Sequence, residues 1–158
     1  MCRNNLSLEH PYGDIGQMIA FIIFVSIWIT DSFILRFSTM LENYIPLYAR
    51  MILMALLFVF AGYLIRSAHQ MIFNKVRTSS QVISNGVFSR VRHPMYLGII
   101  LFYIGLLGAT LSLLSLGFLV IIFLFYYYIT SFEEKQLAKI FGKDYMEYKE
   151  KTPKWLPR

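Results

Sequence analysis

Long uncharged stretches dominate the chain and alternate with short polar segments. The first, residues 15–35, has 21 residues and a single charged side chain, Asp31. The second covers residues 46–65 and carries Arg50 one turn inside its start. The third, residues 97–132, has 36 residues and no charge. Because about 20 apolar residues cross a bilayer as a helix, this pattern predicts membrane-spanning helices.

The third stretch is too long for one span. At ~1.5 Å per residue it would form a helix of ~54 Å, against a hydrocarbon core of ~30 Å. Small residues that favour a turn lie near its middle: Gly108, Ser112, Ser115 and Gly117. We therefore predict two spans, about 97–110 and 114–132, joined in a tight helical hairpin. With the first two stretches, this gives an all-α polytopic membrane protein with four transmembrane helices.

The composition agrees with a membrane protein. Of the 158 residues, 57% are hydrophobic and only 15% are charged, whereas soluble domains usually have about 25% charged residues. A disordered chain is excluded by the 17% of aromatic residues. A disulfide framework is excluded because the chain has one cysteine. We expect residues 1–158 to form a single integral membrane domain.

The net charge of +6 predicts an orientation and not a nucleic-acid partner. Four spans place both termini and the connection over residues 66–96 on the same side of the membrane. That side holds 13 of the 15 Lys and Arg residues, and only Arg36 and Arg50 lie on the other. By the positive-inside rule, the termini and this connection are predicted to face the cytoplasm, with the protein in the cytoplasmic or inner membrane.

A polar segment follows the fourth span, beginning with Glu133 and Glu134. Downstream of this pair, apolar and aromatic side chains recur on one helical face: Leu137, Ile140, Phe141, Tyr145 and Tyr148. This spacing predicts a C-terminal amphipathic helix on the cytoplasmic side. Gly142 is a candidate break within the helix, and Pro153 is expected to end it.

Two polar groups next to the spans are candidates for chemistry. Arg90, Arg92, His93 and Tyr96 lie directly before the third span and form either a basic membrane anchor or the wall of a pocket at a helix start. The Glu133-Glu134 pair is either a solvated helix end or a binding site. Asp31, inside a span, is either functional or interfacial. The isolated His10 and His69 predict no metal site.

Together these residues resemble a known family. Residues 86–98 contain arginine-histidine-proline-x-tyrosine at positions 92–96, and an uncharged hairpin and paired glutamates follow in order. This arrangement is similar to that of the isoprenylcysteine carboxyl methyltransferase family and the related phospholipid methyltransferases. The resemblance covers residues 74–157.

The resemblance implies an S-adenosylmethionine site that faces the cytoplasm and a substrate that enters from the membrane. It implies catalytic roles for Arg92, His93 and Glu134. The cofactor would be bound by the segment before the motif, by the motif itself and by the first glutamate: Gln81, Val82, Ile83, Phe88, His93, Pro94, Met95, Tyr96 and Glu133. A carboxylate and aromatic faces suit a cofactor that carries a sulfonium and an ammonium. No metal is implied.

One position departs from the family pattern. Eukaryotic members place an arginine one helical turn before the paired glutamates, where it can hold the substrate carboxylate. Here that turn reads Tyr127-Tyr128-Ile129, without a cation. Arg92 or Arg90 is a candidate substitute. The departure leaves open whether the methyl acceptor is an oxygen, a nitrogen or a sulfur atom.

We therefore expect a membrane methyltransferase that acts on a lipophilic small molecule or a lipid-linked substrate in contact with membrane lipid. The leading hypothesis is an isoprenylcysteine carboxyl O-methyltransferase-like enzyme. A phospholipid N-methyltransferase and a thiol S-methyltransferase are the enzymatic alternatives. A non-catalytic scaffold or transporter subunit that holds anionic lipid through its basic face is the alternative from another class.

Overall fold

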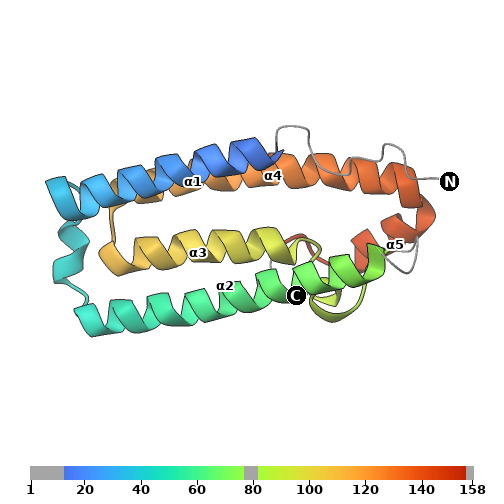
Figure 1. The fold of residues 1–158 in the computed structure, drawn as a ribbon, viewed down its shortest axis with the longest axis horizontal. Helices are drawn as coiled ribbons and strands as arrows, with labels where there is room; N and C mark the ends of the chain where they lie inside the picture. The colour runs from blue at the N-terminus through green and yellow to red at the C-terminus, as the bar shows by residue number, and fades with distance from the viewer. Residues whose placement is uncertain (1–12, 77–81, 156–158) are drawn as a thin grey trace.

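The chain forms long helices that run side by side, as the computed structural model shows for residues 13–76 and 82–155 (Figure 1). The elements are α1 (Gly13–Ile29), the π-helical turn η1 (Thr30–Leu35), the 3₁₀ turn η2 (Met40–Asn43), α2 (Leu47–Val76), the 3₁₀ turn η3 (Gly86–Ser89), α3 (Pro94–Thr110), α4 (Leu113–Phe141) and α5 (Lys143–Lys151). The described residues contain no strand, which confirms the predicted all-α class.

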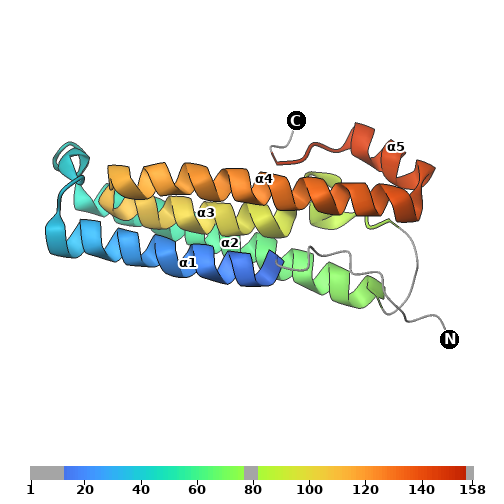
Figure 2. The ribbon, with the colours of Figure 1, turned by 90° about the horizontal axis from the view of Figure 1, so that it is seen from above.

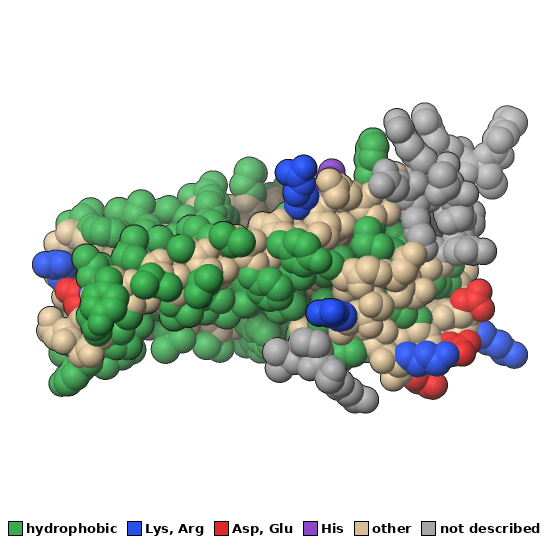
Figure 3. Space-filling view, turned by 90° about the horizontal axis from the view of Figure 1, so that it is seen from below, with side chains coloured by type: hydrophobic (Ala, Val, Ile, Leu, Met, Phe, Trp, Pro, Cys, Tyr) green, Lys and Arg blue, Asp and Glu red, His purple; other side chains and the backbone are tan. Residues whose placement is uncertain are grey.

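Among the described residues, three helical segments are long and apolar enough to cross a membrane: Gly13–Leu35, Leu47–Phe73 and Leu113–Phe141. The fourth apolar helix, α3, is shorter, with 17 residues. Large apolar side chains are exposed along these helices, among them Ile22, Val59 and Leu124 at 55%, 74% and 61%. Figure 3 shows such side chains covering much of one face, with charged side chains at both ends of the molecule. Such a surface suits lipid and not water, so the protein is an integral membrane protein.

The long uncharged stretch is divided at Leu111 and Ser112. α3 ends at Thr110, and Leu111 takes a left-handed conformation with φ of 52°. Ser112 then caps α4, because its hydroxyl oxygen accepts a hydrogen bond from the Ser115 backbone N–H at 3.0 Å. The cap satisfies one of the first N–H groups of α4, which have no partner within the helix.

The connection between α1 and α2 closes over this turn. Asp31, 1% exposed, accepts hydrogen bonds from the hydroxyl groups of Ser38 and Ser112 and from the Ser38 backbone N–H at 3.1 Å. The Trp28 indole donates to Leu106 O at 3.0 Å, at the end of α3. The buried Asp31 therefore joins two connections, and its observed contacts are structural.

Close contact between α2 and α3 depends on glycine. An ideal Cβ on Gly98 would lie 2.9 Å from Ala61 O and 2.8 Å from Ile65 Cγ1. An ideal Cβ on Gly105 would lie 2.7 Å from the Phe58 ring. Small residues let helix backbones approach closely, so these glycines fix where α3 lies against α2.

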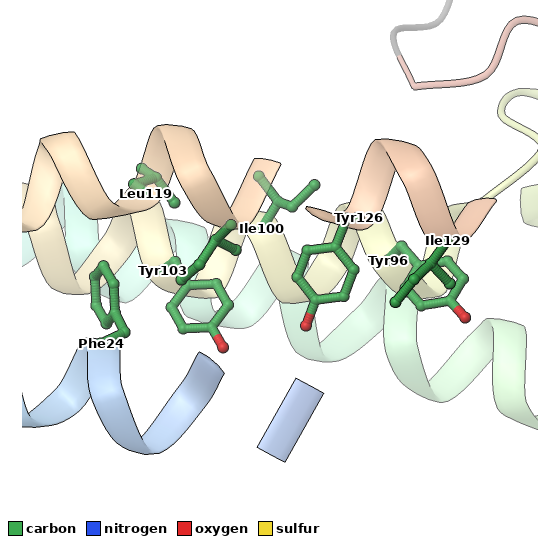
Figure 4. Close-up of a cluster of buried hydrophobic side chains, with 8 residues drawn as sticks. Phe24, Tyr96, Ile100, Tyr103, Leu119, Tyr126 and Ile129 are labelled. Atoms are coloured by element: carbon green, nitrogen blue, oxygen red, sulfur yellow. The ribbon is translucent and has the colours of Figure 1, made fainter. Parts of the chain in front are cut away.

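Aromatic and aliphatic side chains of α1, α3 and α4 meet in the core (Figure 4). Phe24 of α1 packs edge-on against Tyr103 of α3, with ring centroids 4.7 Å apart. Tyr126 of α4 lies against Tyr96 of α3 at 5.5 Å. This packing extends to the first turn of α3, and so it holds α3 and α4 together next to the charged residues described below.

The segment after the fourth span is divided at Gly142, the candidate break named in the sequence. α4 continues past Glu133 and Glu134 to Phe141, so the pair lies inside a helix and not at its end. Gly142 then takes φ of 55° and separates α4 from α5, which folds back over α4 (Figure 2). Positive φ is accessible to glycine without strain, so the chain reverses here.

Candidate functional site

The start of α3 presents the arginine-histidine-proline motif. Pro94 occupies the first turn of the helix, where its missing N–H costs no hydrogen bond, and His93 is the N-cap with non-helical backbone angles. The Arg92 backbone N–H donates to Pro153 O at 2.9 Å, so the residues after α5 hold this junction. Pro94 itself is fully buried.

Glu134 is the centre of the charged cluster. Its Oε1 atom accepts hydrogen bonds from Arg92 Nε at 3.1 Å and Nη2 at 3.0 Å, and His93 Nε2 lies at 3.1 Å. Its Oε2 atom lies 3.2 Å from Lys149 Nζ. Glu134 is 5% exposed. A buried carboxylate needs this compensation, so Glu134 acts as the anchor for its basic neighbours.

The Arg92 guanidinium joins three elements. Besides its bonds to Glu134 on α4, its Nη1 atom donates to Lys149 O at 2.8 Å and to Thr152 O at 2.6 Å. It therefore ties the start of α3 to α4, to α5 and to the residues that follow α5. These contacts occupy the guanidinium within the protein, which favours a positioning role for Arg92 over direct contact with a substrate.

Glu133 faces a different set of groups. The Tyr96 hydroxyl donates to its Oε1 atom, and His93 Nδ1 lies 3.8 Å from its Oε2 atom. The side chain of Glu133 is 14% exposed. The Tyr96 and His93 rings lie 6.0 Å apart. The structure therefore brings together His93, Tyr96 and both glutamates.

The His93 imidazole lies between the two carboxylates and is 6% exposed. Burial lowers the pKa of His93 below its usual range, while the hydrogen bond and the charge of Glu134 act in the opposite direction. Burial is the larger influence, and the cations Lys154 and Arg92 add to it. A neutral imidazole is therefore favoured at neutral pH.

The other predicted cofactor residues lie in the segment before α3 and in its first turn. Phe88, in η3, and Met95, in α3, pack against the buried cluster of Leu64, Ala68 and Val87. Phe88 O accepts a hydrogen bond from the Tyr148 hydroxyl at 2.6 Å, which links η3 to α5. Val82 and Ile83 are partly buried in the irregular segment before η3. The predicted residue Gln81 lies outside the described residues.

Residues after Gly142 make contacts with the charged cluster that the sequence does not predict. Lys154 Nζ donates to Ser131 Oγ at 2.7 Å, lies 4.2 Å from the centre of the Tyr127 ring and is 4.0 Å from Glu134 Oε1. The Trp155 ring lies 6.0 Å from the ring of His93 and 6.1 Å from that of Phe123. The sequence spacing of Lys154 and Trp155 does not predict these contacts, because a non-helical segment after α5 brings both residues back to α4.

An open, polar cleft of about 430 Å³ lies between the segment around η3 and α5. Its lining residues are Ser84, Ser89, Asp144, Glu147, Tyr148, Lys151 and Thr152. None of the predicted site residues lines this cleft. The cleft is adjacent to the charged cluster because Thr152, one of its lining residues, accepts a hydrogen bond from Arg92. Within the described residues, no group of three or more His, Cys, Asp or Glu is placed to hold a metal ion.

The chain is similar to a known protein family. The family described as Phospholipid methyltransferase matches residues 47–144, which is more than half of the chain. The matched range includes α2, α3 and α4, with Arg92, His93, Tyr96, Glu133 and Glu134. It ends before Tyr145, Lys154 and Trp155. No solved structure matches the chain significantly.

Three curated relatives carry the name protein-S-isoprenylcysteine O-methyltransferase. The Schizosaccharomyces pombe protein is 28% identical over 95 residues, 58% of this chain and 39% of the relative. The Arabidopsis thaliana B protein is 28% identical over 78 residues, 49% of this chain and 40% of the relative. The Xenopus laevis protein is 34% identical over 85 residues, 53% of this chain and 30% of the relative. The match thus spans well under half of each relative's length.

Proposed function

The chain belongs to the phospholipid methyltransferase family, and from this premise we propose that it transfers a methyl group from S-adenosylmethionine to the carboxylate of a lipophilic acceptor. The observation that carries the proposal is the meeting of Glu133, His93 and Tyr96 at the start of α3. The names of the three relatives support an oxygen acceptor.

The two glutamates suit different roles. The negative charge of Glu134 is compensated by Arg92 and Lys149, so we assign Glu134 a role in positioning the neighbouring side chains. Glu133 contacts the Tyr96 phenol and the His93 imidazole. Its negative charge suits the positive groups of the cofactor, with Tyr96 and Phe88 as aromatic neighbours. Gln81, Val82, Ile83, Pro94 and Met95 complete the proposed cofactor site.

The reaction needs positioning and exclusion of water. When bound, S-adenosylmethionine supplies a methyl group on a sulfonium; the acceptor oxygen bonds to the methyl carbon while the sulfur keeps the electron pair of the broken bond. Opposite charges disappear in this step, so strong solvation of the reactants would slow it. The protein's part is to hold the two reactants in line in a site shielded from water.

Lys154 is the proposed cation for the acceptor carboxylate. It lies over Tyr127, on the turn where the related family carries an arginine, and Ile129 of that turn is buried. Arg92 is occupied by Glu134 and two backbone carbonyls. Burial lowers the pKa of Lys154, and Glu134 opposes this shift. We infer that Lys154 attracts the anionic group of the acceptor.

We further propose four membrane crossings, with α3 as the short one. The part of α4 from Leu113 to Phe132 has 20 residues, which at ~1.5 Å per residue spans the ~30 Å hydrocarbon core and places Glu133 at the membrane boundary. The excess of Lys and Arg on this side supports a cytoplasmic site. A lipophilic substrate would then reach it from the membrane.

The test uses labelled S-adenosylmethionine and N-acetyl-S-farnesylcysteine, with the methyl ester of the same compound as a control that has no free carboxylate. We expect labelling of the free acid alone. Lys154→Met should raise KM for the acid about tenfold and leave cofactor binding unchanged, whereas the exposed Lys151→Met should change neither. Equal labelling of acid and ester, or an unchanged KM in Lys154→Met, would contradict the assigned acceptor site.

The family description favours a second candidate, a phospholipid N-methyltransferase. The same assay with extracted membrane lipids separates the two functions. Label in an aminophospholipid fraction, together with an unlabelled prenylcysteine, would replace the carboxylate with an amine as the acceptor. A thiol acceptor would leave both fractions unlabelled and label an apolar thiol instead.

A further inference from the structure

A buried hydroxyl group lacks a hydrogen-bond partner near the proposed cofactor site. Tyr145, in the first turn of α5, is 2% exposed, and its hydroxyl has no partner within the part of the chain that the structure describes. The Trp155 indole N–H is the other such buried side-chain atom in the described residues. Leaving a buried polar group unpaired is costly, so each case calls for a physical reason.

Tyr145 lies one helical turn before Lys149 in α5, and the Lys149 Nζ atom is 3.2 Å from Glu134 Oε2. Burial raises the pKa of Tyr145, and the negative charges of Glu134 and Glu133 raise it further, while Arg92 lowers it. The group therefore remains an O–H donor at neutral pH. The neighbouring Tyr148 hydroxyl, by contrast, has its acceptor, Phe88 O, at 2.6 Å.

The neighbouring charged groups leave one requirement of the cofactor unmet. The amino-acid end of S-adenosylmethionine carries an ammonium and a carboxylate. Glu133 suits the ammonium, but Arg92 is bound to Glu134, Lys149 O and Thr152 O and is not available for the carboxylate. A buried O–H donor beside this cluster supplies what the carboxylate needs.

We propose that the Tyr145 hydroxyl donates a hydrogen bond to the carboxylate at the amino-acid end of S-adenosylmethionine. This inference rests on the proposed function and assigns α5 to the cofactor site. In the free protein the unpaired hydroxyl costs stability, and the bound cofactor removes that cost. Tyr145 thus binds the cofactor, whereas Tyr148 holds α5 against η3.

Tyr145→Phe separates a binding role from a packing role because it removes only the hydroxyl. Without ligand, we expect its midpoint of thermal unfolding to rise by about 2–4 °C, since a buried unpaired group is lost. With S-adenosylhomocysteine, we expect about tenfold weaker binding. Tyr148→Phe is the matched control, and it should lower the unfolding midpoint because it removes a hydrogen bond that is already made.

Two probes locate the contact. S-adenosylhomocysteine has the amino-acid end, and 5′-methylthioadenosine lacks it. We expect calorimetry to show the tenfold loss in Tyr145→Phe for the first probe and less than a twofold change for the second. Equal losses for both probes, or an unchanged affinity for S-adenosylhomocysteine, would overturn the inference, as would a lower unfolding midpoint of the free Tyr145→Phe protein. If the wild-type protein binds neither probe, the proposed function itself fails.

Discussion

We expect substitution of the two adjacent glutamates, Glu133 and Glu134, to change the stability of the protein by different amounts. Glu134 is buried and pairs with Arg92, so Glu134→Gln should lower the free energy of unfolding by about 3 kcal/mol, because it leaves the largely buried Arg92 guanidinium without its charged partner. Glu133→Gln, next to it in the same helix, is the matched control for stability and should change it by less than about 1 kcal/mol. Chemical unfolding in detergent measures both. Similar losses in the two variants would refute this division of roles.

His93 gives stability a dependence on pH. Its pKa in the folded protein is lowered by burial, with Lys154 and Arg92 acting in the same direction and Glu134 opposing them. The unfolded chain therefore binds a proton near pH 6.5 that the folded protein does not, so this contribution to stability is lost as pH falls below about 6.5.

His93→Gln should reduce the loss of thermal stability between pH 7.5 and pH 5.5, because it removes the titrating group. Unfolding midpoints of the wild type and the variant at the two pH values measure the effect. His69→Gln, on α2, is the control and should retain the wild-type dependence. An unchanged pH dependence in His93→Gln would show that other groups control it.

The sequence indicates the individual site residues because their chemistry is local. Arginine-histidine-proline-x-tyrosine and the paired glutamates are contiguous motifs, and the structure brings Arg92, His93, Tyr96, Glu133 and Glu134 into contact. Lys154 and Tyr145 are not predictable in this way. Their positions depend on the reversal at Gly142 and on the path after α5, which no periodic pattern encodes.

At the scale of helices, α2 and α3 pack through glycine. Gly98→Ala should destabilise the protein, because the new Cβ would meet the Ala61 carbonyl oxygen, a backbone atom that cannot easily move. Gly117→Ala is the control, since a Cβ there has no neighbour within 4 Å and alanine favours a helix. Thermal unfolding should show a loss of several degrees only for Gly98→Ala. Equal midpoints would contradict close packing.

Hydropathy predicts the helices themselves, but it does not predict where every helix ends. Residues 97–132 need a break because a straight helix would be too long, and the turn is at Leu111 and Ser112. The end of α4 is different. The amphipathic pattern is predicted after the fourth span, and α4 continues through Glu133 and Glu134 to Phe141, where Glu134 contacts cations from other segments. Such tertiary pairing cannot be read from local charge.

At the scale of the whole molecule, the two ends carry different polar groups. One end has Asp31, Ser38 and Ser112 closing the helix connections, and the other has the cluster around Glu134. Asp31→Asn should lower the unfolding midpoint by several degrees and leave the affinity for S-adenosylhomocysteine unchanged in the folded protein, because the two ends are separated by the bundle. Thermal unfolding and calorimetry test this. A tenfold loss of affinity would show that the ends are coupled.

The proposed orientation of the bundle in the membrane rests on the distribution of charge. Single cysteines at Arg36 and at Lys139, in a chain with Cys2 replaced by serine, should react differently with a membrane-impermeant thiol reagent in intact cells. We expect labelling at position 36 only, because 13 of the 15 Lys and Arg residues are assigned to the cytoplasmic side. Labelling of position 139 alone would invert the proposed topology.

The central claim is that Glu133, beside His93 and Tyr96, holds the positive end of an S-adenosyl ligand. Calorimetric titration of the purified protein with S-adenosylhomocysteine tests it most directly. We expect micromolar affinity for the wild type and at least tenfold weaker binding for Glu133→Gln, a loss of about 1.4 kcal/mol or more. No binding by the folded wild-type protein, or equal affinity in the variant, would contradict the claim.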